Sequence, residues 1–229
     1  KNKKNNFKLL LNWLKNNFWI KKKISQSKQN IFQQKCNNFY YEKTLSRINY
    51  LYEKNDIKDQ LEIINNKRIP RLSNLFEKIN WINLNNGIAV NFHGDLHFEN
   101  IIKFKKKITL LDWRESFVDI YEYGDIYYDL AKINHGLIID HNLIKKSKFN
   151  IKKSGNKIQL NFHRENDNKL CQKEFFKFLK MNSYSKQKVE ILTAIIFLNI
   201  ASLHHYPYSI FLYYLGKLTL YNALKNKTQ

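Results

Sequence analysis

The sequence predicts an α+β domain that is mostly helical and carries a small β core, and three observations predict it. Apolar residues recur at helical spacing over 7–20. Two short apolar runs, 101–104 and 108–111, are joined by a lysine-rich turn and predict a β-hairpin. Residues 186–225 hold two long apolar stretches separated by Pro207, which predicts two buried helices.

Composition supports a single folded unit and excludes several classes of function. The 229 residues are 43% hydrophobic, which is enough for a sizeable core. The formal charge is +21, but the lysines are spread along the chain and only five residues are arginine. We therefore expect a lysine-covered surface and no specific nucleic-acid partner. Two cysteines cannot make a disulfide framework or a four-thiolate zinc site, which favours a reducing, cytoplasmic location.

The remaining elements follow from local patterns. A second helix with one apolar face is predicted at 41–52, whereas the polar, basic residues 21–38 predict a loop or a weak helix. An Asn-Asn pair indicates a small hairpin over 61–69, and Asp125 is a plausible N-cap for a helix. The other predicted elements are a helix at 72–79, a strand at 88–90, a hairpin over 149–162, and helices at 167–181, 186–204 and 208–225.

The most apolar part of the chain, Ile191–Gly216, contains no charged residue. A membrane-spanning helix needs roughly 20 consecutive apolar residues. Asn199 and Pro207 interrupt this stretch, so we predict two buried helices and no membrane span.

Three oxygen-bearing side chains lie where a strand, a loop and a hairpin can bring them together. Asp95 follows the strand at 88–90, Asn100 comes later in the same loop, and Asp112 ends the second strand of the hairpin. Carboxylate and amide oxygens are hard ligands that suit Mg²⁺ rather than zinc. A carboxylate left free of the metal can take a proton from a hydroxyl. These groups suit phosphoryl transfer from a nucleotide.

The segment that carries these residues resembles a known family. His93–Asn100 reads HGDLHFEN and matches the catalytic loop (H-G-D, four residues, N) of the aminoglycoside phosphotransferase and choline kinase family, which has a protein-kinase-like fold. Leu111–Trp113 resembles the family's metal-binding strand end. Gly124–Ala131 is similar to the G-D-x-x-x-D-L-A helix start that follows.

The resemblance implies a role for each residue. Asp95 would be the base that accepts or orients the substrate hydroxyl, and Asn100 and Asp112 would hold Mg²⁺ against the phosphates of ATP or GTP. His93 would brace the loop, and Asp129 would support it from behind by hydrogen bonding. The acceptor would be a small molecule with a hydroxyl group: a sugar, a choline-like amino alcohol or an aminoglycoside. The chain looks like bacterial phosphotransferases of surface-polysaccharide or choline-type metabolism.

Two features depart from the family pattern. Many relatives have an acid directly after the D-W pair, whereas this chain has Arg114, which weakens the case for a second metal contact from this strand. The first glycine is Gly87, so no Gly-rich loop precedes the catalytic loop, and the early residues read as mostly helical. We therefore expect the family's nucleotide-binding N-terminal β lobe to be missing from this chain or separately encoded. The phosphate-pairing lysine of that lobe has no counterpart that we can assign.

The chain is thus predicted to be the kinase-like C-terminal lobe over 1–229. Within it we expect a helical segment at 1–86, a catalytic core at 87–136 and a helical, substrate-side part at 137–229. Acidic or aromatic residues are expected to recognise the acceptor, and the candidates by residue type are Glu165, Asp167, Trp81 and Tyr206. His97, between Asp95 and Asn100, is expected to be exposed.

Two other interpretations stay open. Gly94–His97 also resembles the G-D-x-H opening of metallophosphoesterases, with Gly124-Asp125 and Asn134-His135 as the later motifs. The D-R-G continuation of their second motif is missing, and Asn100 and Asp112 would have no role. Alternatively, the chain is an inactive kinase-like lobe with a non-catalytic function.

Overall fold

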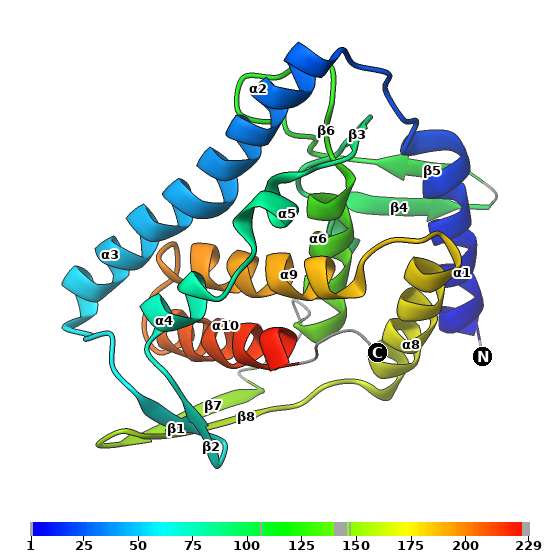
Figure 1. Cartoon of the computed structure of the whole chain (residues 1–229). Helices are drawn as coiled ribbons and strands as arrows, with labels where there is room; N and C mark the ends of the chain where they lie inside the picture. The colour runs from blue at the N-terminus through cyan, green and yellow to red at the C-terminus, as the bar shows by residue number, and fades with distance from the viewer. Residues whose placement is uncertain (1, 106, 140–145, 147, 226–229) are drawn as a thin grey trace.

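The computed structural model describes residues 2–105, 107–139, 146 and 148–225. These residues form an α+β structure in which helices dominate and three small sheets lie at the edges (Figure 1). The predicted mostly helical α+β class is therefore confirmed.

The N-terminal part is helical, as predicted, and more completely so than expected. Helix α1 (Asn2–Trp13) continues into a π-helical turn, and α3 (Lys43–Asn55) is the second predicted helix. Of the two alternatives predicted for 21–38, a loop or a weak helix, the helix is correct over most of the segment, because α2 spans Gln26–Asn37. Ser25 caps this helix by accepting from the backbone of Lys28 at 3.3 Å.

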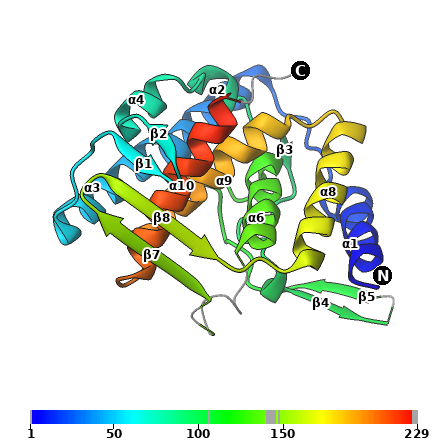
Figure 2. The same ribbon diagram turned by 90° about the horizontal axis from the view of Figure 1, so that it is seen from below.

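Four further helices form the centre of the molecule: α6 (Ile126–Ile138), α8 (Asn166–Met181), α9 (Lys186–Ala201) and α10 (Tyr208–Lys225). Helix α9 packs against both α10 and α6 (Figures 1 and 2). Its residues 191–198 are all buried, which explains why this stretch lacks an amphipathic pattern. Among the described residues, no helix combines the length and the apolar character that crossing a membrane requires.

The largest sheet joins two hairpins that are far apart in the sequence. Strands β1 (Glu62–Ile64) and β2 (Lys67–Ile69) form one hairpin, and β7 (Phe149–Ser154) and β8 (Lys157–Phe162) form the other. Both hairpins were predicted. Strand β1 then pairs in parallel with β8 and gives the order β2-β1-β8-β7, a long-range contact that local patterns do not encode.

Two small sheets frame the segment with the candidate site. Strand β3 (Ala89–Val90) pairs with β6 (Gly124–Asp125), and β4 (Ile101–Phe104) pairs with β5 (Lys107–Leu110) as predicted. Asp125 is the N-cap of α6, also as predicted, because its Oδ1 accepts from the Tyr127 backbone at 3.1 Å.

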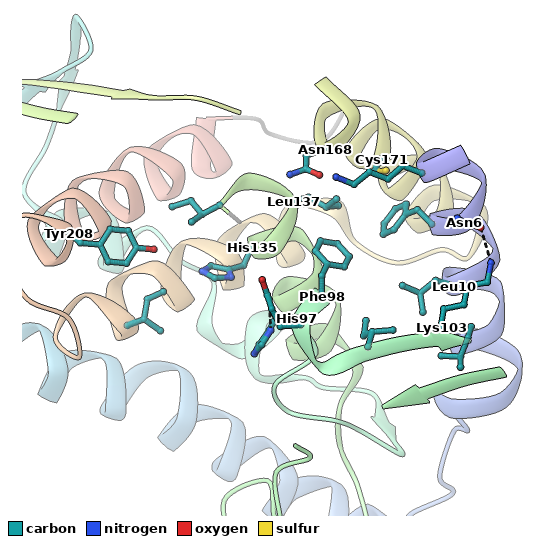
Figure 3. A pocket seen from close by; sticks show the side chains of 18 of the residues that line it. Asn6, Leu10, His97, Phe98, Lys103, His135, Leu137, Asn168, Cys171 and Tyr208 are labelled. Carbon is teal, nitrogen blue, oxygen red and sulfur yellow. Dashed lines mark hydrogen bonds and ion pairs between the residues drawn. The ribbon is translucent and has the colours of Figure 1, made fainter. Parts of the chain in front are cut away.

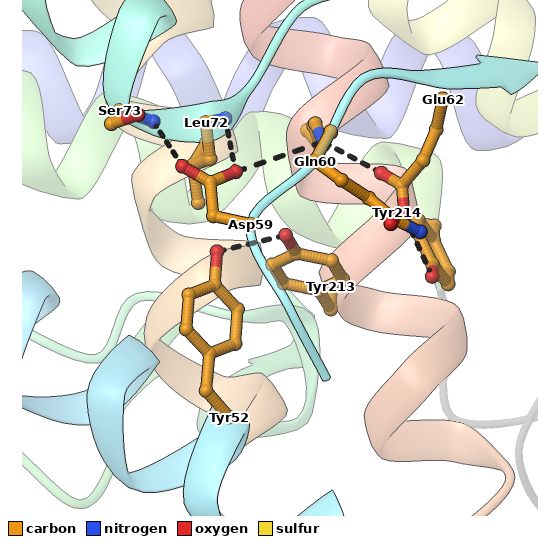
Figure 4. Close-up of polar contacts among 9 residues, drawn as sticks. Tyr52, Asp59, Gln60, Glu62, Leu72, Ser73, Tyr213 and Tyr214 are labelled. Atoms are coloured by element: carbon orange, nitrogen blue, oxygen red, sulfur yellow. Dashed lines mark hydrogen bonds and ion pairs between the residues drawn. The ribbon is translucent and has the colours of Figure 1, made fainter. Parts of the chain in front are cut away.

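A buried polar cluster fastens the first hairpin to α10 (Figure 4). Lys217 is fully buried and lies 2.6 Å from Glu62, whose other oxygen accepts from Tyr214 at 3.0 Å. Asp59 lies at 4.0 Å from Lys217 and caps the short helix α4 (Leu72–Glu77) by accepting from two of its first backbone N–H groups. The segment around β1 and β2, which precedes the candidate site in the chain, is thereby joined to α10.

Candidate functional site

The loop after β3 is held from behind by one buried carboxylate. Asp129, on the first turn of α6, accepts from the backbone of His93 at 2.9 Å and of Gly94 at 2.8 Å. It also accepts from the indole of Trp19 at 3.1 Å. Burial raises the pKa of Asp129 to about 6, although the two backbone donors and Trp19 oppose that shift. The geometry matches the supporting role that the sequence resemblance implied for Asp129.

Gly94 makes the sharp bend of this loop. Its φ of +77° lies in the left-handed region, where a side chain is strained. A Cβ at this position would also lie 2.5 Å from the Arg114 side chain, so glycine allows Arg114 to pack closely on the loop. The next residue, Asp95, is thereby turned outward from the buried backbone that Asp129 holds.

Asp95 is the centre of a chain of charged contacts. Its Oδ1 lies 2.6 Å from Lys132 Nζ, and its Oδ2 lies 3.6 Å from His97 Nε2. His97 in turn contacts Glu99 at 2.8 Å. The side chain of Asp95 is 35% exposed, whereas that of Lys132 is only 10% exposed. Asp95 therefore combines a nearly buried cationic partner with access to solvent.

These contacts keep Asp95 ionised. Burial would raise the pKa of Asp95, but its contacts with His97 and Lys132 outweigh burial and hold that pKa well below its usual range. The contact with Asp95 also raises the pKa of His97. The expectation of an exposed His97 was wrong, because its ring is half-buried between two carboxylates.

His93 lies inside the loop and is fully buried. Its Nδ1 accepts from the Asp95 backbone at 3.2 Å, and burial lowers the pKa of the ring, so His93 is neutral. The backbone carbonyl of His93 accepts from the backbone N–H of Arg114 at 2.9 Å. This position agrees with the predicted bracing role and does not give His93 access to a substrate.

Asn100 and Asp112 lie at the same end of the β4–β5 hairpin. Asn100 is buried, and its Nδ2 donates to the Asp95 carbonyl at 3.0 Å. The backbone carbonyl of Asn100 accepts from the backbone N–H of Leu111 at 2.9 Å. Asp112, the next residue, therefore follows directly beside Asn100. Asp112 is exposed and turns the chain with a φ of 52°. The charges of Asp95 and Asp112 both raise the pKa of His93 against the effect of burial.

A cavity of about 230 Å³ opens beside Asp95. It lies between α3, α6, α9 and the segment after β5. Apolar and aromatic residues make up much of its wall, together with Asp95 and four cationic side chains. The charged lining residues are Lys43, Arg47, Asp95, Arg114 and Lys132. Glu165, Asp167, Trp81 and Tyr206, the residues that we expected by type to recognise an acceptor, do not line it.

A larger cavity of about 520 Å³ lies beside His97, which forms part of its lining (Figure 3). Its wall combines apolar side chains of α1 and α6 with His135, whose two ring nitrogens have no hydrogen-bond partner among the described residues. Burial lowers the pKa of His135 to about 3, so this ring is neutral. His97 and Glu99 line this cavity, whereas Asp95 does not.

Sequence reasoning missed Lys132 and the three other cations of the smaller cavity. One signal was present for Lys132: it lies three residues after Asp129, which places both on one face of α6. Lys43 and Arg47 likewise lie four residues apart on α3. Nothing in the sequence indicated that these two faces approach Arg114.

We compared the chain with protein-family models, with curated proteins and with solved structures, and no match was found.

Proposed function

We propose that this chain is the kinase-like lobe of a Mg²⁺-dependent phosphotransferase that transfers the γ-phosphate of ATP or GTP to a hydroxyl of a small molecule. The proposal rests on the H-G-D loop, the D-W strand end and the G-D-x-x-x-D-L-A helix start in this sequence. A nucleotide-binding β lobe of the kind that the family resemblance implies would complete the nucleotide site.

One observation carries the proposal: an ionised Asp95 faces a cavity while Asp129 and Asn100 hold its backbone. Asp129 fixes the backbone before Asp95, and Asn100 donates to the Asp95 carbonyl at 3.0 Å. Catalysis of phosphoryl transfer consists largely of positioning and electrostatic stabilisation, so a rigid backbone at the reacting carboxylate is the feature to expect.

In the proposed reaction, Asp95 orients the acceptor hydroxyl and receives its proton. The hydroxyl oxygen forms a bond to the γ-phosphorus as the bond to the β–γ bridging oxygen breaks, and ADP leaves. The low pKa of Asp95 makes it a weak base. We therefore assign it mainly to orientation, with proton transfer late in the reaction. A loose transition state needs little help from a base.

Asn100 and Asp112 have the donor chemistry that Mg²⁺ requires. Because the Asn100 NH₂ group donates to Asp95, its amide oxygen is the atom left to ligate. Two protein oxygens fit an ion that keeps water and phosphate oxygens as its other ligands. When bound, Mg²⁺ would neutralise developing charge on the phosphates.

The metallophosphoesterase alternative requires Asp125 to be a metal ligand. Asp125 is instead fully buried. It accepts from the Tyr40 hydroxyl at 2.9 Å and from two backbone N–H groups, at 3.0 Å and 3.1 Å. All of these contacts are made with other residues of the fold. The phosphotransferase proposal therefore gives a role to more residues of the segment than the metallophosphoesterase alternative does. If the assay below detects no turnover, the alternative of an inactive kinase-like lobe replaces this proposal.

The test is a nucleoside-diphosphate-release assay on the full-length protein, which measures ADP from Mg·ATP and GDP from Mg·GTP, over sugars, choline and aminoglycosides. Asp95→Asn keeps an oxygen that accepts from Lys132 but removes the charge, and we expect it to reduce turnover by roughly two orders of magnitude or more. Asp119→Asn is the matched control, since Asp119 is 78% exposed and pairs only with Lys35 on the surface. Equal activity of the two variants would remove Asp95 from the mechanism.

A further inference from the structure

The cavity beside Asp95 has an unusual charge for a site that accepts sugars or cationic alcohols. Its lining includes Lys43, Arg47, Arg114 and Lys132, and Asp95 is the only acid among the described lining residues. Only Lys132 has a carboxylate partner; no described acid lies within 4.0 Å of the other three. The cavity therefore contains cations that no acid among the described residues neutralises.

Arg114 is held in place by aromatic rings rather than by an acid. Its guanidinium carbon lies 5.4 Å from the ring centre of Phe39 and 5.8 Å from that of Tyr128. Its Nε is buried and has no hydrogen-bond partner among the described residues. A buried, unsatisfied guanidinium donor is costly unless a ligand accepts from it. Two of the chain's five arginines, Arg47 and Arg114, lie in this cavity, and arginine is the residue best suited to bidentate binding of phosphate or carboxylate.

The cations are also close enough to repel one another. Burial, together with the charges of Arg47, Arg114 and Lys132, lowers the pKa of Lys43 to about 8. Burial and Arg114 likewise lower the pKa of Arg47, with only Tyr128 opposing. An anion placed among these side chains would relieve the repulsion, so the cavity is arranged for a negatively charged group.

The cavity lies on the acceptor side of Asp95 in the proposed mechanism. Its lining includes Asp95 but neither Asn100 nor Asp112, the residues proposed to hold the metal and nucleotide phosphates. It draws on α3, α6 and α9, whereas the two metal-site residues lie at the end of the β4–β5 hairpin. A group bound in the cavity would thus approach Asp95 from the helical side.

We infer that the acceptor is an anionic small molecule, whose phosphate or carboxylate group binds Arg47, Arg114 and Lys43 while its hydroxyl reaches Asp95. This inference rests on the proposed phosphotransferase function and narrows its acceptor class. A sugar phosphate fits this cavity, whereas choline and aminoglycosides are cationic and would be repelled. Arg114, at a position where many relatives have an acid, is the main residue that selects the anion.

The first test measures anion binding without catalysis. Inorganic phosphate is titrated into the full chain by calorimetry, in metal-free buffer without nucleotide. We expect binding that Arg114→Gln weakens by about tenfold or more, with Arg68→Gln unchanged because Arg68 is exposed on β2 and outside the cavity. Arg47→Gln, at a partly exposed position, repeats the test if Arg114→Gln unfolds. The inference fails if phosphate does not bind, or if the cavity variants and Arg68→Gln weaken binding equally.

The second test separates acceptor anion from nucleotide phosphate. The phosphate titration is repeated with saturating Mg·ATP, and we expect the phosphate affinity to be unchanged. Loss of phosphate binding in proportion to nucleotide saturation would assign the cations to the nucleotide and overturn the acceptor assignment.

The third test uses matched acceptors in the ADP-release assay: a hexose phosphate, the same hexose without phosphate, and choline. We expect turnover of the hexose phosphate, with a KM that Arg114→Gln raises about tenfold or more and Arg68→Gln leaves unchanged. Turnover of only the neutral or cationic acceptors, unaffected by Arg114→Gln, overturns the anionic class and leaves phosphotransfer standing. No turnover of any acceptor, with phosphate binding intact, overturns the proposed function while the anion site remains.

Discussion

Lys132 reaches Asp95 from the same helix whose Asp129 holds the backbone on which Asp95 lies. The Lys132 Nζ to Asp95 Oδ1 distance is 2.6 Å, and Asp129 accepts from the two residues directly before Asp95. One face of α6 therefore sets both the position of the loop and the charge of its carboxylate. A displacement of this helix would change both properties together.

Removing the lysine should alter the titration of Asp95. In Lys132→Met we expect the pKa of Asp95 to rise towards its ordinary value of 3.8, because burial then acts with less opposition from a nearby cation. The measurement is a carboxyl-carbon NMR titration. Lys186→Met is the control, since Lys186 is an exposed lysine that pairs with Glu190 on α9. An unchanged Asp95 titration in Lys132→Met would show that the ion pair does not set this pKa.

Replacing the supporting carboxylate should destabilise the fold. In Asp129→Asn the amide NH₂ must face at least one of the N–H donors now bound by Asp129, namely those of Trp19, His93 and Gly94. Leaving a buried donor unsatisfied costs about 1–3 kcal/mol, and we expect a loss of that size in urea unfolding. A loss below about 0.5 kcal/mol would mean that the loop does not depend on this carboxylate.

The same variant should change the pH dependence of stability. Because the folded-state pKa of Asp129 is raised from 3.8 to about 6, the native protein binds the proton more tightly than the unfolded chain does. This stabilising contribution is fully present below pH 3.8 and is lost as the pH rises through about 6. We therefore expect the free-energy difference between wild type and Asp129→Asn to shrink as the pH rises through this window. A constant difference would contradict the raised pKa.

Asp112 should matter for the metal and little for stability. It is exposed, and asparagine tolerates the left-handed backbone that Asp112 adopts, so we expect Asp112→Asn to change the free energy of unfolding by less than about 0.5 kcal/mol. Under the proposed mechanism, the variant should bind Mg·ATP about tenfold or more weakly, with a smaller effect on nucleotide without metal. Tryptophan fluorescence is a suitable signal, because Trp113 is the neighbouring residue. Equal effects with and without Mg²⁺ would exclude Asp112 as a metal ligand.

The buried ion pair of α10 should be important for stability only. In Lys217→Met the carboxylate of Glu62 stays buried without its cation, which costs about 3–5 kcal/mol. The double variant Glu62→Gln with Lys217→Met should recover part of that loss, because the buried side chain at position 62 then carries no charge. Both are measured by urea unfolding. A double variant less stable than Lys217→Met would show that the cost comes from packing rather than from charge.

The sequence by itself determined most helices and hairpins of this protein. Helical spacing indicated the helices at 7–20 and 41–52, turn residues marked both hairpins of the larger sheet, and Asp125 was recognisable as a cap. These signals are local, since a helix face repeats within a few residues and a turn depends on its own backbone. Helix α2 could not be told apart from a loop, because only Phe32 and Cys36 form its buried face.

Only the tertiary structure decided which charges meet at Asp95. Lys43 and Arg47 come from α3, Lys132 from α6 and Arg114 from the segment after β5, and each alone reads as a solvated surface charge. They come together because the packing of α6 and α9 brings distant helices to one cavity, and no local pattern encodes that approach. The sequence therefore located the carboxylate that we propose to react, whereas long-range packing determined its electrostatic surroundings.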